Sequence, residues 1–323
     1  MKDTNSAGDF LDGVSARVAE IIEDTKDMNP SFLSTGLFKT INSDALQYNT
    51  EGVSGLGLLQ PFAENDSIPE DETYAQYKTE YVAKQYGEIV SISQLLANTR
   101  PADLENKLNE VKQLMIAANR SLDTHAWQVL NDGFSASDSV TGLPISRLSD
   151  GLSQFSTSHT SRVPNVAVRS NRLASNVVLS ESNLFTAMKM LREMLNGRGQ
   201  LMGYQGGFTL VIPPALEKLA QEITQSTLKS DTADNDLNFY TGTINTVVSN
   251  YLGAASGLGS DTQWFVFAND PMNLSLRYVP LLSPKVEQER DFDTKAQRVS
   301  IDGAWAFGYS NFEYGVASDG SAS

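Results

Sequence analysis

The residues able to act as metal ligands or nucleophiles are few and scattered in this sequence. Cysteine is absent, so disulfides, thiolate metal sites and cysteine nucleophiles are all excluded. The two histidines are His125, on the apolar stripe of a predicted helix, and His159, in a serine-rich stretch. Their spacing fits neither the H-E-x-x-H pattern nor any other pair of neighbouring zinc ligands. The sequence therefore argues against a zinc hydrolase, and we interpret His125 as a packing residue.

Acidic pairs offer a second kind of site, for a divalent cation. Asp291 and Asp293 stand two apart in a predicted strand, which would turn both carboxylates to one face. An oxygen-ligand cage needs more groups than two, so a solvated strand edge is the simpler interpretation. Asp231, Asp234 and Asp236 resemble the start of a calcium-binding loop but lack its glycine and its final glutamate. An acidic metal-dependent hydrolase using Asp291 and Asp293 stays as an alternative.

Two glycine-containing segments partly match catalytic or phosphate-binding motifs. Residues 52–56 (GVSGL) resemble a nucleophile elbow, but the last position is not glycine and no strand leads into a helix there. Gly197-Arg198-Gly199 is a fragment of a phosphate-binding loop without a third glycine or a Gly-Lys-Ser ending. Both segments are therefore interpreted as loops or turns, and the sequence predicts no catalytic residue, no metal and no cofactor.

The distribution of charge is more informative than any catalytic motif. Five carboxylates crowd the tip of a predicted hairpin, whereas residues 151–180 contain three arginines and no acidic residue. Opposite patches on one chain suit a heterologous contact between identical chains, which closes rings or continues as a lattice. Surface ion pairs contribute only about 0–1 kcal/mol, so hydration of both patches is the competing interpretation. The candidate contact residues are Glu64, Asp66, Glu70, Asp71, Glu72, Arg162, Arg169 and Arg172.

Composition and net charge restrict the class of protein. The chain has 323 residues, of which 24 are Lys or Arg and 39 are Asp or Glu, giving a formal charge of -15. Such a charge argues against a surface built to bind nucleic-acid phosphates, since that binding depends on Lys and Arg. The N-terminus lacks the basic start and apolar run of a signal peptide, and no apolar run reaches the ~18 residues of a membrane span. These features predict a soluble chain made in the cytoplasm.

One long helix dominates the predicted secondary structure. Apolar residues alternate three and four apart over residues 101–130, which predicts a single amphipathic helix. Pro101 suits its first turn, and Asn131-Asp132-Gly133 supplies the stop signal. About 29 residues at ~1.5 Å each give a rod of roughly 43 Å, which needs an equally long surface to pack against.

The segment before this helix predicts an exposed hairpin. Residues 51–60 hold three glycines, and residues 74–93 are rich in Tyr, Val, Ile and Thr, the composition of paired strands. We interpret residues 58–86 as a two-stranded excursion. An isolated hairpin is marginal in water, so we expect another copy of the chain to supply a surface for it.

The second half of the chain predicts a sheet covered by helices. A helix over residues 180–196 precedes a buried strand at residues 208–212, a helix opened by Pro213-Pro214, and a strand at residues 243–248. This order implies a right-handed crossover between parallel strands. The apolar face of the first helix consists of Leu184, Phe185, Met188, Leu191 and Leu195. Further predictions are a buried strand at residues 264–267 and a long hairpin at residues 286–316, pivoting near Thr294-Lys295.

A set of passages is informative through its order along the chain. The passages are KQYGEIVSISQLLAN (84–98), THAWQVLNDG (124–133), TLVIPPALEKLA (209–220), INTVVSNYL (244–252), WFVFAND (264–270), PKVEQERDFDT (284–294) and WAFGYSNFEYGVASDG (305–320). Their order resembles that of tailed-bacteriophage major capsid proteins, including the group related to the Mu-type head subunit. Each motif alone is loose, but the ordered set is fairly specific and covers the chain from about residue 50.

The resemblance implies an α+β chain with the capsid fold of the Hong Kong 97 type. It maps residues 1–50 to an N-terminal arm and residues 51–90 to an extended E-loop hairpin. A peripheral domain would comprise residues 91–170 and 285–304, including a spine helix at residues 101–130. An axial domain would comprise residues 171–284 and 305–323, with a central sheet flanked by helices.

For function, the resemblance implies a major capsid protein, a structural protein rather than an enzyme. Copies would self-assemble as hexamers and pentamers into an icosahedral shell, the virion head, enclosing the double-stranded DNA of a tailed phage or prophage without sequence-specific binding. Only about 50 residues precede the E-loop, so a separate scaffolding protein is expected, together with a portal and a decoration protein. The alternative on the same fold is an encapsulin-like compartment that encloses an enzyme.

Overall fold

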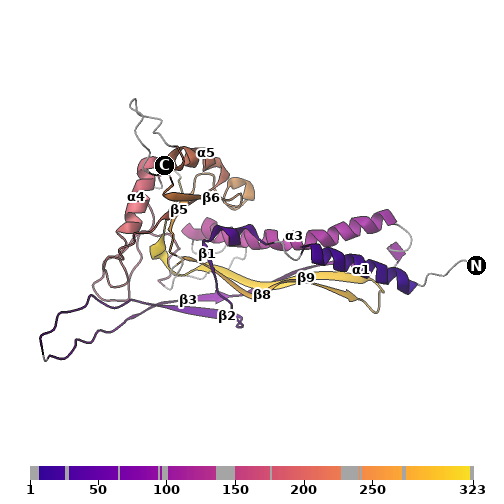
Figure 1. Ribbon diagram of the computed structural model, residues 1–323, viewed down its shortest axis with the longest axis horizontal. Coiled ribbons are helices and arrows are strands. Elements are labelled where there is room, and N and C mark those ends of the chain that lie inside the picture. The colour runs from indigo at the N-terminus through magenta and orange to yellow at the C-terminus, as the bar shows by residue number, and fades with distance from the viewer. Residues whose placement is uncertain are drawn as a thin grey trace, which may run out of the picture.

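The computed structural model describes residues 7–25, 29–64, 66–93, 95–96, 101–135, 150–174, 177–226, 240, 242–270 and 274–320. The chain has an elongated arm, a compact head and a projecting loop (Figure 1). The arm contains the longest of the described helices, and the head contains a second sheet. Over these residues, no helix combines the length and the apolar composition needed to cross a membrane.

The arm is built on a four-stranded sheet in the order β1-β8-β9-β4. The antiparallel hairpin of β8 (Leu276–Arg290) and β9 (Gln297–Tyr309) forms its centre. Strand β4 (Lys84–Ile92) is antiparallel to β9, and the short β1 (Phe38–Thr40) is parallel to β8. Helix α3 (Pro101–Asn131) runs along this sheet, as Figure 1 shows. The long predicted helix is confirmed, and the sheet is the long surface that it needed.

Helix α3 packs through the apolar stripe that its sequence predicts. Leu108 and Val111 are buried in one cluster with Val299 of β9. Helix α1 (Ala7–Thr25) lies beside this part of α3 and adds Val18 to the same cluster. Full burial of an aliphatic side chain contributes about 1.5–3 kcal/mol, so tertiary packing stabilises this helix more than helix propensity does.

The head contains a second four-stranded sheet, in the order β10-β7-β5-β6. Strands β5 (Phe208–Ile212) and β6 (Ile244–Val248) are parallel, whereas β7 (Trp264–Ala268) and β10 (Gly315–Ser318) run antiparallel to their partners. Helices α4 (Glu181–Arg192) and α5 (Glu217–Thr224) flank this sheet (Figure 1). Every residue of β5 and β7 is buried, which confirms both as core strands.

Short 3-10 helices join these elements. They are η1 (Ser31–Thr35), η2 (Asp132–Phe134), η4 (Pro214–Leu216), η5 (Ala254–Ser256) and η6 (Phe312–Tyr314). The turn η2 ends α3 at the predicted stop signal, and η6 leads the chain from β9 in the arm to β10 in the head. The last strands of the chain therefore link the two sheets.

The arm and the head share an aromatic core. Phe32 meets Tyr278 of the arm sheet edge to face, with ring centroids 5.2 Å apart. Phe155 lies 5.4 Å from Phe265 of the head sheet. Both pairs belong to one buried cluster that includes Trp127 of α3. Because aromatic pairs favour specific geometries, this cluster fixes how the two sheets are joined.

A separate two-stranded hairpin lies against the arm. Strand β2 (Gln47–Val53) pairs antiparallel with β3 (Ala75–Val82), and the described residues between them, 54–64 and 66–74, contain no helix or strand. The predicted excursion at residues 58–86 is wrong in its strand positions, because β2 begins earlier and β4 pairs with β9 of the arm sheet. The excursion itself is confirmed, and its unpaired tip is longer than the sequence indicates.

Two further predicted boundaries are wrong. The hairpin assigned to residues 286–316 runs from Leu276 to Tyr309, because the first residues of β8 are buried in succession and show no alternation. Val316 belongs to β10 in the head sheet. Asp291 and Asp293 lie in the turn that follows β8, so they do not share one face of a strand.

The predicted helix at residues 180–196 is also shorter and buries a different face. Helix α4 ends at Arg192, and its N-terminus is capped by Ser180, whose side chain accepts a hydrogen bond from the Asn183 N–H. Phe185 is 54% exposed, although the sequence places it on the apolar face. The face that packs on the head sheet instead consists of Leu184, Ala187, Met188 and Leu191.

Candidate functional site

A large exposed apolar surface lies on the loop of residues 54–74. Leu59 is 99% exposed and Leu58 is 81% exposed, values close to those of an unfolded chain. The exposed apolar side chains of this loop are Leu56, Leu58, Leu59, Phe62 and Ile68. Contiguous apolar exposure of this kind marks a surface that another molecule covers. The loop projects away from both sheets in Figure 1, so this chain does not cover it.

The same loop is acidic along its length. No Lys, Arg or His occurs between Lys39 and Lys78, so the loop has no cation of its own. Four of the five predicted contact carboxylates are exposed and form no ion pair within the described part of the chain: Glu64, Asp66, Glu70 and Glu72. The loop thus combines apolar side chains with uncompensated negative charge.

The fifth carboxylate, Asp71, pairs with Arg198 and forms what we call the Asp71–Arg198 clasp. The guanidinium donates from Nη1 to Oδ2 and from Nη2 to Oδ1, each at 2.8 Å. The N–H of Gly57 donates to Oδ2 at 2.6 Å, and Arg198 also donates to the carbonyl of Glu72. The Gly57 N–H and then the Arg198 guanidinium hold the pKa of the Asp71 carboxyl below its usual value. This two-pronged geometry fixes the start and the end of the loop to the same side chain.

The strand that follows the loop is anchored to the segment around residue 161. Gln76 Nε2 donates to Ser161 Oγ at 3.3 Å, and Ser161 Oγ donates to the carbonyl of Gly197 at 2.5 Å. The guanidinium of Arg162 lies 4.9 Å above the ring of Tyr77. The base of the loop is therefore held in place, while its tip extends into solvent.

The three predicted contact arginines have different surroundings. Arg162 is exposed. Arg169 is buried, and its Nη1 lies 2.9 Å from Glu313 Oε1. Arg172 pairs with Asp319 at 2.9 Å. Arg169 and Arg172 thus have partners inside the chain, and the contact between chains stays a prediction for all three.

His159 belongs to a buried structural network. Its Nδ1 lies 2.7 Å from Asp150 Oδ2, and its ring stacks on Phe312 with centroids 3.9 Å apart. Asn171 donates from Nδ2 to the carbonyls of Phe312 and Gly315. These contacts connect the serine-rich segment to the last strand of the head, and the histidine is fully buried. His159 is therefore a packing residue.

The other residues considered as catalytic or metal-binding candidates, His125 and Asp291, have structural contacts within the described part of the chain. His125 Nδ1 accepts a hydrogen bond from Trp305 Nε1 at 3.1 Å, which confirms it as a packing residue. Asp291 accepts from the N–H groups of Asp293 and Thr294, and it pairs with Arg298. The Thr294 and Asp293 N–H groups and the Arg298 charge keep the pKa of this carboxyl low.

Among the described residues, the motifs that resemble metal or nucleophile sites form no such site. Ser54 is buried, and its N–H donates to the carbonyl of Tyr74 at 2.9 Å, next to the last residue pair of the β2–β3 hairpin. Within the ranges that the structure describes, no three of the His, Asp and Glu side chains are placed to hold a metal ion. Asp231, Asp234 and Asp236 lie outside the described residues.

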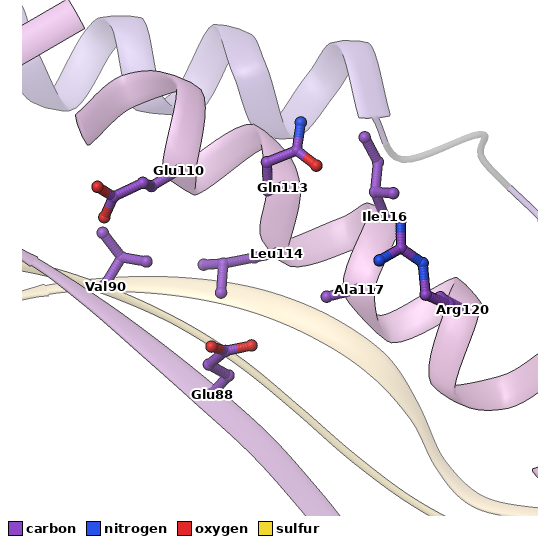
Figure 2. Close-up of a pocket in the computed structure, with 8 residues that line it drawn as sticks. All are labelled: Glu88, Val90, Glu110, Gln113, Leu114, Ile116, Ala117 and Arg120. Carbon is purple, nitrogen blue, oxygen red and sulfur yellow. The ribbon is translucent and has the colours of Figure 1, made fainter. Parts of the chain in front are cut away.

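A surface groove lies between α3 and β4. Figure 2 shows its lining: Glu88 and Val90 from β4, and Glu110, Gln113, Leu114, Ile116, Ala117 and Arg120 from α3. The lining combines two carboxylates, one guanidinium and short apolar side chains, with no nucleophile beside a base. The groove therefore has no arrangement that indicates catalysis.

Arg198 is a functional residue that sequence reasoning missed. The sequence shows it only as the middle of Gly197-Arg198-Gly199, a turn motif. Its partner Asp71 is 127 positions away, so no local pattern connects them. Two separate signals were available: the acidic excursion has no cation of its own, and Arg198 stands between two glycines in a predicted turn.

Comparisons with known proteins identify the family to which this chain belongs. A sequence model of the phage capsid protein family matches residues 76–318, most of the chain. The chain therefore belongs to the phage capsid protein family. None of the curated protein sequences matches it.

Solved structures of phage capsids share its fold. The capsid of Ralstonia phage GP4 is 12% identical, with a TM-score of 0.53 and coverage of 87% of this chain and 87% of that chain. The Mycobacterium phage Patience structure is 10% identical, with a TM-score of 0.54 and coverage of 98% and 89%. The capsid of Cyanophage P-SCSP1u is 14% identical, with a TM-score of 0.53 and coverage of 90% and 88%. The predicted α+β capsid fold is confirmed.

Family membership also shows what kind of protein this is. The chain is a structural protein of the phage capsid rather than an enzyme, and its place is the virion shell. An encapsulin-like compartment is not favoured, since the matching family is that of phage capsids. The closer resemblance to the Mu-type group stays a prediction, because the match names phage capsid proteins in general.

Proposed function

We propose that copies of this chain self-assemble as hexamers and pentamers into an icosahedral head shell enclosing the double-stranded DNA genome of a tailed phage or prophage. The observation that supports this most is the loop of residues 54–74, which presents apolar and acidic side chains away from the body of the chain. In a head-to-tail contact, each copy covers a different patch on its neighbour, and such contacts close into rings.

We assign the elements to capsid domains as the resemblance implies. Residues 1–50 are the N-terminal arm and residues 51–90 the E-loop. The peripheral domain comprises residues 91–170 and 285–304, with α3 as its spine helix, and the axial domain comprises residues 171–284 and 305–323. Two features support the assignment: α3 lies along the long sheet, and a second sheet with flanking helices forms the head.

For the contact between subunits, we propose that the acidic loop of one copy meets a basic surface on the next. Glu64, Asp66, Glu70 and Glu72 are exposed and available for this contact. Arg162 is the exposed arginine of the predicted basic segment, while Arg169 and Arg172 hold that segment through internal pairs. Asp71 acts through the clasp by fixing the position of the loop.

The proposed partners follow from the same function. Assembly in the host cytoplasm would involve a separate scaffolding protein and a portal, with a decoration protein added to the finished shell. The packaged DNA would be enclosed rather than bound by sequence, which agrees with the net charge of -15.

Assembly can be tested with a variant that lacks the loop tip. Residues 58–68 are replaced by a short Gly-Ser linker, which leaves the Asp71–Arg198 clasp in place. The intact chain should form closed particles in negative-stain electron micrographs, whereas the loop variant should remain as folded subunits. Closed particles of normal size from the loop variant would contradict the role of the loop. The circular dichroism spectrum of the loop variant controls for misfolding.

A further inference from the structure

The turn that joins β8 to β9 presents an aromatic ring to solvent. Phe292 is 83% exposed, and the Nζ of Lys295 lies 4.0 Å from the centroid of its ring. Asp293, next to Phe292, is exposed and forms no ion pair within the described part of the chain. This turn therefore carries one apolar side chain together with one cation and one anion.

Hydrogen bonds hold the turn in one shape. Asp291 accepts from the N–H groups of Asp293 at 2.9 Å and Thr294 at 3.0 Å, and it pairs with Arg298. Lys295 has a φ of 56°, in the left-handed region that glycine adopts at lower cost. A lysine in this conformation favours a use for its charge. Because the turn is already ordered, a contact made by it loses little conformational entropy.

The groove between α3 and β4 has a complementary lining (Figure 2). Glu88 of β4 and Arg120 of α3 border it, and both are exposed without an ion pair in the described part of the chain. Glu110, the other carboxylate of the lining, already pairs with Lys107 at 2.6 Å. The floor between these charges consists of half-buried and buried apolar side chains: Val90, Leu114, Ile116 and Ala117.

The groove is large enough for one aromatic ring. Its volume is about 260 Å³. An apolar cavity of about 150 Å³ already accommodates benzene. The groove and the turn therefore match in size, in apolar character and in having one unpaired charge of each sign.

The turn of a chain cannot enter the groove of the same chain. Strand β9 pairs Gln297 with Ile92 and Ile301 with Glu88. About 14 Å of paired strand therefore separates Glu88 from the start of the turn. The pairing of β8 with β9 continues to Arg290 and Gln297, which keeps the turn at the far end of the arm sheet. A ring from another molecule has to fill the groove.

We propose that the turn of residues 291–296 docks in the α3–β4 groove of a second copy, with Phe292 on the apolar floor. Lys295 then pairs with Glu88, and Asp293 pairs with Arg120. This inference rests on the proposed function and adds a second contact between copies, apart from the acidic loop. The acidic loop fits this groove less well, because it offers carboxylates without a cation. Each copy carries both the turn and the groove, so the contact is heterologous.

Disulfide trapping tests this contact in the full chain, which contains no cysteine of its own. Thr294→Cys and Gln113→Cys place one thiol on the turn and one on the groove lining. The oxidised double variant should give covalent dimers and longer ladders on a non-reducing gel. The matched control combines Thr294→Cys with Lys112→Cys. Lys112 is exposed, lies about 100° around the helix from Gln113 and does not line the groove, so this control should remain monomeric.

Two results of the trapping experiment would overturn the proposal. Covalent dimers from Thr294→Cys alone would show that two turns meet each other instead. Assembled particles of the double variant that yield only monomers would show that the groove is empty or is covered by another segment or an accessory protein.

A charge exchange tests the proposed ion pair. Lys295→Glu should raise the protein concentration needed for assembly about fivefold, because it places like charges together. Adding Glu88→Lys should restore most of this loss. Glu289→Lys is the matched control, since Glu289 is exposed on β8 and lies outside the groove lining. Equal restoration by both lysines would show that only net charge matters, and no restoration by Glu88→Lys would overturn the pairing.

The same experiments separate this inference from the proposed function. Shell formation by the unmodified chain tests the proposed function, whereas the covalent ladder tests the docking of the turn. Shells without a ladder overturn this inference alone. Neither shells nor a ladder from concentrated protein overturn both.

Discussion

The carboxylate of Asp123, on α3, accepts hydrogen bonds from the backbone N–H groups of Ser31 at 3.0 Å and Phe32 at 2.9 Å. These groups are the first N–H donors of η1, which have no partner within the turn itself. A side chain from the long helix therefore caps a segment about 90 residues earlier in the chain. This contact holds Phe32 in the aromatic core that joins the arm and the head.

Removal of this cap should destabilise the chain. Asp123→Ala leaves the buried Phe32 N–H and the part-buried Ser31 N–H without acceptors, so we expect the free energy of unfolding to fall by about 2–3 kcal/mol. Asp123→Asn keeps one acceptor oxygen and should cost less than half as much. Urea denaturation of the dissociated chain measures both changes. Equal stability of all three proteins would show that η1 is held by the Phe32 packing alone.

Breaking the Asp71–Arg198 clasp should release the loop without unfolding the body. In Arg198→Gln, the two hydrogen bonds to Asp71 and the contact with the Glu72 carbonyl are lost. We expect proteolysis within residues 54–74 to become several-fold faster, with an unchanged unfolding midpoint. Lys218→Gln is a control at an exposed i,i+4 pair and should alter neither quantity. An unchanged cleavage rate in Arg198→Gln would mean that the hairpin base alone positions the loop.

The clasp should also depend on pH. The folded-state pKa of Asp71 is lowered, first by the Gly57 N–H and then by Arg198. For a lowered carboxyl pKa, the stabilisation is complete above the unfolded value of about 3.9 and is lost as pH falls through the folded value. The rate of loop cleavage, divided at each pH by the rate of the same protease on an unstructured peptide of the loop sequence, should therefore rise below about pH 4 and stay constant above about pH 5. In Asp71→Asn, the rate should be high throughout, and a constant slow rate down to pH 2 in the unmodified chain would contradict the account.

A methyl group at Gly133 should strain the aromatic core. A Cβ there would lie 2.7 Å from Cδ2 of Phe155, a ring that is fully buried beside Phe265. We expect Gly133→Ala to lower the free energy of unfolding by about 1–3 kcal/mol, as overpacking does. Gly207→Ala is the matched control, since its Cβ would meet only ordinary contacts at 3.5 Å and beyond. A denaturation midpoint unchanged in Gly133→Ala would show that Phe155 can move.

The sequence predicts the elements whose pattern is local. The helix at residues 101–130 is found as α3, because its apolar stripe and its stop signal are both written within one window. The buried strands β5 and β7 are found as continuous apolar runs bounded by Pro, Asn or Gly. The parallel pairing of β5 with β6 agrees with the strand, helix, strand order around α5.

Features set by distant parts of the chain are the ones that the sequence does not predict. Val316 looks like the end of the long hairpin, but the turn at η6 moves it into the other sheet. The partner of Asp71 is Arg198 rather than an arginine of the predicted basic segment, because the fold places the Gly197–Gly199 turn beside the base of the loop. Such pairings depend on tertiary structure, which no local pattern records.

We infer that the exposed loop of each copy is covered by a neighbouring copy when the chains join into a closed shell. Cryo-electron microscopy of the expressed protein tests it most directly. The account predicts closed particles with five-fold and six-fold clusters of subunits, in which the loop of residues 54–74 lies on a neighbouring copy. Light scattering that detects only compact monomers, at every protein concentration and salt level tried and with or without accessory proteins, would contradict it.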